Sequence, residues 1–169
     1  APGPTARGFR YAQTVSAAAM AFGHGMQDAA KTAGVVALAL VASGHRAPGD
    51  LSIPWWAIAS SAVVLSVGTY AGGWRIIRTL GSRIIDLTPP QGFAAEATAA
   101  TVLYVATATG APISTTQAIS SAIVGVGATR SAKSVRWGVA RSIAIAWVLT
   151  IPGAGLIAAV VYLLIATFL

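Results

Sequence analysis

The chain has 169 residues, of which 56% are hydrophobic and only 9% are charged. Soluble domains contain about 25% charged residues, and disordered chains combine low hydrophobicity with high charge, so both classes are excluded. The absence of cysteine excludes a disulfide framework, a thiolate metal site and a cysteine nucleophile. The net charge of +7 comes from short loops between apolar segments, which favours a role in membrane orientation over nucleic-acid binding.

Three long stretches, 51–74, 97–129 and 142–169, contain no charged residue. A membrane-spanning helix needs about 20 predominantly apolar residues. The sequence therefore predicts an all-α integral membrane protein with several embedded segments. We expect a multi-pass protein of the cell membrane, surrounded by the lipid bilayer.

The Pro/Gly-rich start, 1–8, is expected to be a linker before a membrane domain over 9–169. The hydrophobic stretch 9–43 is interrupted by the sequence GHGMQD at 23–28. Two glycines around a polar residue, followed by Gln-Asp, are unfavourable inside a helix. We expect an interrupted helix over 9–43, with its break at membrane depth.

Residues 53–71 are expected to form the next span, and the two tryptophans at its start suit the membrane interface. Residues 73–87 alternate arginines with aliphatic residues at near-helical spacing, which is typical of an amphipathic helix on the membrane surface. The last segment, 135–169, is expected to be one long span kinked at Pro152.

The segment 91–128 is divided by Gly-Ala-Pro at 110–112. Its second piece, 114–128, would cover only about 22 Å as a helix, less than the roughly 30 Å hydrocarbon core. We predict a re-entrant helical hairpin, with two short full spans as the alternative. Arginine and lysine clusters at 75–83 and 130–136 flank the hairpin, so both clusters share one side, which the positive-inside rule makes cytoplasmic.

Three ionisable residues lie within apolar segments: Asp28, Lys31 and Glu96. Such residues are costly in a bilayer, by at least a few kcal/mol, and they usually face a cavity or pathway. Asp28 and Lys31 are three positions apart and can pair on one helical face, so a structural ion pair is the alternative to a functional role. For Glu96 the alternative is a surface position at a helix start.

Ser114, Thr115 and Thr116 follow a proline and are suited to the N-terminus of a helix. The free N–H groups there and the hydroxyl donors can bind an anion, as half-helices in transporters do. An ordinary helix cap is the alternative. The second candidate for such an N-terminus begins near Gln27 and Asp28.

Several blocks, in order, resemble the C-terminal half of the inorganic phosphate transporter (PiT) family: FRYAQTVSAAAMAFGHGMQDAAKTAGVVALAL, GGWRIIRTLG, QGFAAE, PISTTQAISSAIVGVG, and VRWGV with AWVLTIP. Together they cover nearly the whole chain. Two positions depart from the family pattern. Gln27 replaces the usual Asn of the signature, and Gln117 replaces the usual His after Ser-Thr-Thr, which removes a titratable group.

Members of the family carry two related halves in inverted orientation, with the substrate between them. Only one copy of each motif occurs in this sequence. The resemblance therefore implies half of an inverted-repeat transporter with discontinuous helices. A missing N-terminal half or a second chain, as in a homo-oligomer, would complete the site.

The function implied by the resemblance is cation- or proton-coupled symport of inorganic phosphate. The expected phosphate-binding residues are Gln27, Asp28, 114–116 and Gln117. Asp28 and Glu96 are expected to bind the coupling ion, because a bare carboxylate would repel phosphate; Lys31 is a possible ion-pair partner. The ion could be H⁺, Na⁺ or a metal carried with phosphate, and neither a cofactor nor a resident metal is expected.

Enzymatic activity is not expected, because the sequence has no nucleotide-binding loop and no triad-like set of residues. Transport of another oxyanion such as sulfate is the closest alternative. A non-transporting membrane subunit is a third possibility, since the glycines and alanines of 94–128 would serve packing equally well.

Overall fold

The computed structural model describes residues 4–168, and this part of the chain consists of helices without a strand. The first helix, α1, runs from Pro4 to Ala42 without interruption and is about 58 Å long. The expected break at 23–28 is therefore wrong. The expected linker is wrong from Pro4 onward, while residues 1–3 lie outside the described range.

The second helix, α2 (Trp55–Gly72), is followed at once by α3 (Trp74–Arg78) and a π-helical segment, η1 (Thr79–Arg83). The chain bends by 57° between α2 and the pair α3–η1. Gly73 lies at the bend, where an added Cβ would come within 2.5 Å of the Thr69 carbonyl oxygen. A glycine is thus required for this close approach.

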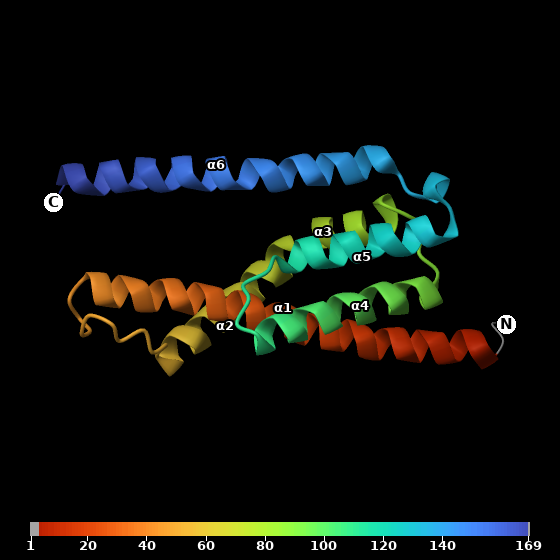
Figure 1. Cartoon of the computed structure of the whole chain (residues 1–169), viewed down its shortest axis with the longest axis horizontal. Coiled ribbons are helices and arrows are strands. Elements are labelled where there is room, and N and C mark those ends of the chain that lie inside the picture. Colours follow the sequence, from red (N-terminus) through yellow and green to blue (C-terminus); the bar gives the residue numbers. More distant parts are fainter. Residues whose placement is uncertain (1–3, 169) are drawn as a thin grey trace.

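A helical hairpin follows, formed by α4 (Pro89–Ala108) and the antiparallel α5 (Thr115–Arg130) (Figure 1). At the start of α4, the Gln91 side-chain oxygen accepts hydrogen bonds from the N–H and the hydroxyl of Thr88. At the end of α4, Gly110 adopts φ +69, a left-handed conformation that favours glycine. Gln91 and Gly110 therefore help to define where the first helix of the hairpin begins and ends.

Helices α1 and α4 lie side by side and run in the same direction (Figure 1). Ser16 contacts Glu96, and Gln27 contacts Thr107. The two members of each pair are 80 residues apart in the sequence, so the two helices keep the same register along their contact. Small residues line this contact, and a Cβ added at Gly23 would meet Leu103 at an ordinary van der Waals distance of 3.6 Å.

This packing explains why α1 is continuous. A glycine in a helix interior costs about 1 kcal/mol relative to alanine, a cost that tertiary contacts offset. Gly23 is buried next to Leu103 of α4, and the buried Gln27 amide donates a 2.8 Å hydrogen bond to the Thr107 hydroxyl. Gly23 and Gln27, two of the residues that were expected to break the helix, therefore contact α4.

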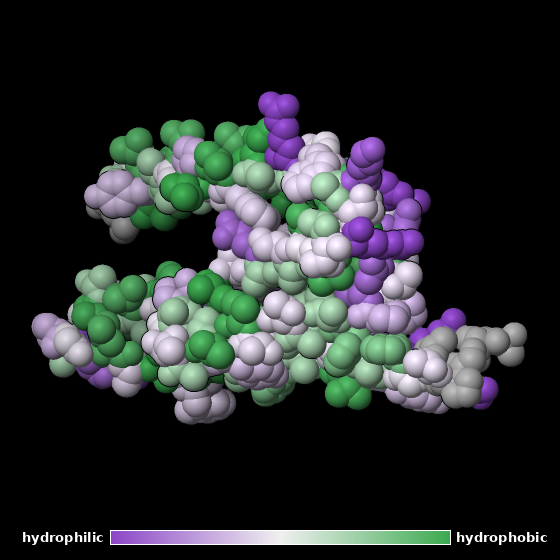
Figure 2. All heavy atoms as spheres, turned by 45° about the vertical axis from the view of Figure 1, so that its right-hand side comes forward, coloured by the Kyte–Doolittle hydropathy of each residue, from purple (hydrophilic) through white to green (hydrophobic). Residues whose placement is uncertain are grey.

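An apolar cluster joins the hairpin to the start of the last helix. Its buried members are Ile84, Ile85, Ala95, Ile123 and Val135. The last helix, α6 (Trp137–Phe168), adds Val139 and Ile143 from its first turns and continues through Pro152. The remainder of α6 lies clear of the other helices, with its apolar side chains exposed (Figure 2).

Of the helices described, only the segment Trp137–Thr167 of α6 is by itself long and apolar enough to cross a membrane. The pair α2 and α3–η1 meets the same criterion only when counted together. The sequence predicted more spans than this. Helix α5, with 16 residues, is shorter than the about 20 that a span needs, and α1 and α4 contain many alanines, glycines and polar residues.

The structure joins the segments that precede and follow the hairpin at one end of the molecule. Arg136 donates hydrogen bonds to the Ser82 carbonyl at 2.6 Å and to the Asp86 carboxylate at 2.9 Å. Hydrophilic side chains gather at this end, opposite the free end of α6 (Figure 2). Arg136 thereby joins the segment before the hairpin, which carries Arg75, Arg78 and Arg83, to the segment after it, which carries Arg130 and Lys133, and we call this the basic end.

Candidate functional site

A pocket of about 350 Å³ lies where the turn between α4 and α5 approaches the middle of α1. It is broadly open on one side. One wall is the acidic and basic pair on α1, and the other is the turn with the first residues of α5. The lining residues are Asp28, Lys31, Pro112, Ile113, Ser114, Thr115 and Thr116.

The charged wall is a cluster on one face of α1. Positions i, i+4 and i+7 share a helical face, which brings His24, Asp28 and Lys31 together. The Lys31 ammonium lies 3.2 Å from Asp28 Oδ1, and His24 Nδ1 lies 3.5 Å from Asp28 Oδ2. The Asp28 and Lys31 side chains are 27% and 36% exposed, so both remain accessible to solvent and to small ions.

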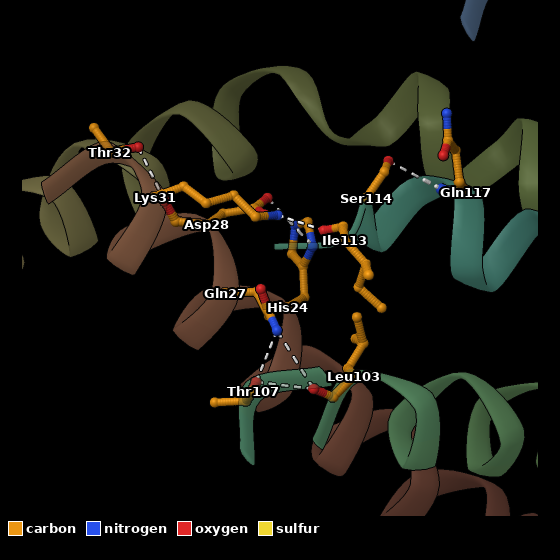
Figure 3. Close-up of polar contacts among 10 residues, drawn as sticks. All are labelled: His24, Gln27, Asp28, Lys31, Thr32, Leu103, Thr107, Ile113, Ser114 and Gln117. Carbon is orange, nitrogen blue, oxygen red and sulfur yellow. Dashed lines mark hydrogen bonds and ion pairs between the residues drawn. The ribbon is translucent and has the colours of Figure 1, made fainter. Parts of the chain in front are cut away.

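Lys31 also reaches across to the turn. Its ammonium donates a hydrogen bond to the Ile113 carbonyl, and this contact joins α1 to the residue directly before Ser114 (Figure 3). One positive charge therefore lies between a carboxylate on α1 and the start of α5.

The opposite wall is the N-terminus of α5. Ser114 is its N-cap, and its hydroxyl oxygen accepts a 3.3 Å hydrogen bond from the Gln117 N–H. The first N–H groups of an α-helix have no acceptor within the helix. Those of Thr115 and Thr116 find none elsewhere among residues 4–168. Thr115 is buried and Thr116 is exposed, so the wall presents hydroxyl and amide donors at two depths.

Three of the expected site residues lie elsewhere. The Gln27 side chain points to α4, where it contacts Thr107 and the Leu103 carbonyl (Figure 3). The Gln117 side chain is exposed and points away from Asp28 and Lys31. Glu96 accepts a 2.6 Å hydrogen bond from Ser16 in the α1–α4 contact, about 16 Å along α4 from Thr107.

Comparison with known proteins identifies the family. The family model described as "Phosphate transporter family" matches residues 2–158. The chain belongs to the phosphate transporter family. The resemblance seen in the sequence is thereby confirmed.

Two relatives are each named "Probable low-affinity inorganic phosphate transporter". The one from Rhizobium meliloti (strain 1021) is 46% identical over 91% of this chain and 46% of its own length. The one from Mycobacterium bovis (strain ATCC BAA-935 / AF2122/97) is 44% identical over 94% of this chain and 38% of its own length. This phosphate transporter family chain therefore spans less than half the length of these curated relatives.

A solved structure named "The sodium-dependent phosphate transporter" has a TM-score of 0.77 and 34% identity, covering 87% of this chain and 37% of that one. The family and the matched relatives are transporters, not enzymes. Membership of the phosphate transporter family implies an integral membrane protein.

Sequence reasoning did not single out His24 as a site residue. The spacing of four residues between His24 and Asp28 is the signal that could have found it, because side chains at i and i+4 are neighbours on a helix. Within residues 4–168, no three His, Asp or Glu side chains come close enough together to hold a metal ion.

Proposed function

We propose that this chain supplies one half of the substrate site of a cation- or proton-coupled phosphate transporter in the cell membrane. The observation that carries the proposal is the open pocket in which the N-terminus of α5 faces Asp28 and Lys31. Family membership supports phosphate as the substrate. The names of the relatives support low-affinity transport of the inorganic ion.

The anion would bind at the start of α5. Its oxygens would accept hydrogen bonds from the N–H groups of Thr115 and Thr116 and from the hydroxyls of 114–116, assisted by the positive end of the helix dipole. In this proposal Gln27 acts indirectly, by holding α1 against α4 next to Asp28. Gln117 fixes the N-cap through its backbone N–H.

The second half of the site would come from residues outside this chain. The pocket is open on one side, and the matched relatives are more than twice as long as the region they share with this chain. We propose an inverted-repeat partner, either the other half of the same protein or a second copy, facing the open side. The short α5 would then be the returning arm of a re-entrant hairpin.

Coupling to a cation follows from the charge of Asp28. At an effective dielectric constant of about 20, two like charges about 4 Å apart repel by roughly 4 kcal/mol. Phosphate beside Asp28 therefore needs a compensating positive charge. The similar solved structure is named as sodium-dependent, which favours Na⁺, while H⁺ and metal-bound phosphate are the other options. Glu96 is proposed as a second ion-binding carboxylate, away from the pocket.

The basic end of the molecule is proposed to be cytoplasmic by the positive-inside rule. Single cysteines at Ser82 and Ser131 should then be labelled from the cytoplasmic side, and one at Ser43 from outside. The sequence has no native cysteine to interfere. Labelling of positions 82 and 131 from opposite sides would contradict this orientation.

Phosphate uptake by membrane vesicles tests the proposal. Vesicles that hold only residues 1–169 should accumulate little phosphate, and co-expression with an N-terminal half should restore uptake. In the assembled transporter, Thr115→Val should weaken phosphate binding, because it removes a donor at the pocket. The matched control is Thr129→Val. The Thr129 hydroxyl donates a hydrogen bond to the Val126 carbonyl at the other end of α5.

Two rival functions predict different results in this assay. A sulfate transporter would accumulate sulfate in preference to phosphate. Sulfate cannot donate a hydrogen bond, whereas phosphate can donate one to the Asp28 carboxylate. A packing subunit would leave uptake unchanged when Thr115 is replaced. Either result would contradict the proposed function.

A further inference from the structure

Lys31 is the one cation that the structure places at the pocket, among residues 4–168, apart from a histidine that is charged only when protonated. Its ammonium touches two oxygens: Asp28 Oδ1 on α1 and the Ile113 carbonyl at the start of the α5 turn. Hard cations such as Na⁺ are held by carboxylate and carbonyl oxygens of this kind. The ammonium therefore occupies the position that a coupling cation would take beside Asp28.

An ammonium group has three N–H donors, and two of them are used here. The Ile113 carbonyl is directly next to Ser114, so the ammonium lies at the edge of the pocket in which phosphate is proposed to bind. The lysine side chain has a flexible four-carbon stem, and at 36% exposure it is not confined by packing. Lys31 can therefore exchange one oxygen partner for another within the pocket.

We propose that Lys31 exchanges partners during coupled binding: when a cation or proton neutralises Asp28, the ammonium leaves Asp28 and pairs with phosphate. This inference rests on the proposed phosphate site. The charges balance, because the pair Asp28⁻·Lys31⁺ plus a cation and a phosphate anion becomes Asp28⁻·cation and Lys31⁺·phosphate. No bond other than these ion pairs and hydrogen bonds is formed or broken.

The exchange explains why the two ligands would help one another. Without the cation, Asp28 holds the ammonium and phosphate finds no free positive charge. Without phosphate, the cation must compete with the ammonium for Asp28 Oδ1 and the Ile113 carbonyl. Each ligand frees the group that the other needs, so their binding is coupled, and linkage requires the effect to be equal in both directions.

The test is the binding of radiolabelled inorganic phosphate to the assembled transporter in sodium-free choline buffer and in saturating Na⁺. In choline buffer, Asp28→Asn should bind phosphate about tenfold more tightly than the parent, because Lys31 no longer has an anionic partner. The double variant Asp28→Asn/Lys31→Met should lose that gain. Lys133→Met is the matched control, since it removes the other lysine at the distant basic end, and it should bind like the parent.

The decisive comparison is between Asp28→Asn and the double variant. If both bind phosphate equally tightly in choline buffer, the gain comes only from removing the repulsive carboxylate, and the exchange is overturned. Lys31→Arg in the Asp28→Asn background keeps the positive charge and should retain most of the gain in affinity. This variant therefore distinguishes an effect of the charge from an effect of misfolding.

Thr115→Val in the same assay separates this inference from the proposed function. If Thr115→Val leaves phosphate affinity unchanged, the phosphate site itself is wrong. If Thr115→Val weakens binding while the double variant still matches Asp28→Asn, the site stands and only the exchange of partners by Lys31 fails.

Discussion

Asp28 and Glu96 are both carboxylates in apolar helices, yet their surroundings differ. Asp28 lies at an open pocket, and each of its oxygens faces a nitrogen, one from Lys31 and one from His24. Glu96 lies in the contact between α1 and α4, where the Ser16 hydroxyl is its partner. A carboxylate that faces a cation and an open pocket can exchange partners with solutes. Glu96 is half-buried and its hydrogen-bond partner is a neutral hydroxyl, so within residues 4–168 it has no cation to exchange.

The largest effect is expected at Asp28. Asp28→Asn in the assembled transporter should abolish accumulation of phosphate against its gradient, because the coupling cation loses its ligand. Phosphate binding itself should persist, since the repulsion between the carboxylate and the anion is removed. Parallel measurements of ion-driven uptake and equilibrium phosphate binding check both statements. Accumulation equal to that of the parent would mean that Asp28 is only a structural partner of Lys31.

Glu96→Gln sharpens the comparison with a smaller effect. The amide keeps an oxygen acceptor for Ser16, so the α1–α4 contact should be preserved. If Glu96 binds a second coupling ion, uptake should slow severalfold. Phosphate affinity should not change, because Glu96 is not among the residues that line the pocket. A loss of phosphate affinity as large as that of Thr115→Val would erase the distinction between the two carboxylates.

The two glutamines of the motifs provide a matched pair for stability. Gln27→Ala should destabilise the folded protein by about 1–3 kcal/mol, because it removes buried hydrogen bonds to Thr107 and Leu103. Gln117→Ala should change stability by less than about 0.5 kcal/mol, because its side chain is exposed. Thermal unfolding in detergent measures both. Equal destabilisation would show that Gln27 does not fasten α1 to α4.

The sequence predicted much of the arrangement. The hairpin and the last helix follow from the positions of prolines and uncharged stretches. Asp28 and Lys31 were selected from their charge, and 114–116 from their capping chemistry. The two groups are more than 80 positions apart along the chain, and the structure brings them to one pocket.

The continuity of α1 could not be predicted, because it depends on contacts with α4. Local propensity counts the cost of Gly23 and Gly25 but does not include the packing of Gly23 against Leu103 or the bond from Gln27 to Thr107. The directions of the Gln27 and Asp28 side chains could not be predicted either. Residues 27 and 28 are adjacent in sequence but about 100° apart around the helix, so one faces α4 and the other the pocket.

A third carboxylate, Asp50, gives the smallest expected effect and tests the comparison from the opposite extreme. It lies in the exposed loop between α1 and α2, where hydrogen bonds from the Ser52 hydroxyl and N–H, and then the nearby Arg46, lower its pKa. A carboxyl group whose pKa is lowered by folding stabilises the folded loop above its ordinary pKa of about 3.9, and this contribution is lost as the pH falls through the lowered value.

Acidification below about pH 4 should therefore loosen this loop. Ser52→Ala should move the Asp50 pKa back toward its ordinary value, because it removes the largest cause of the shift. An NMR titration of the Asp50 carboxyl in the parent and in Ser52→Ala measures the change directly. Phosphate uptake at neutral pH should be the same in both, since Asp50 is not among the residues that line the pocket. A Ser52→Ala variant that loses uptake at neutral pH would mean that an exposed loop carboxylate contributes to transport, and that the pocket and an adjacent cation do not set Asp28 apart.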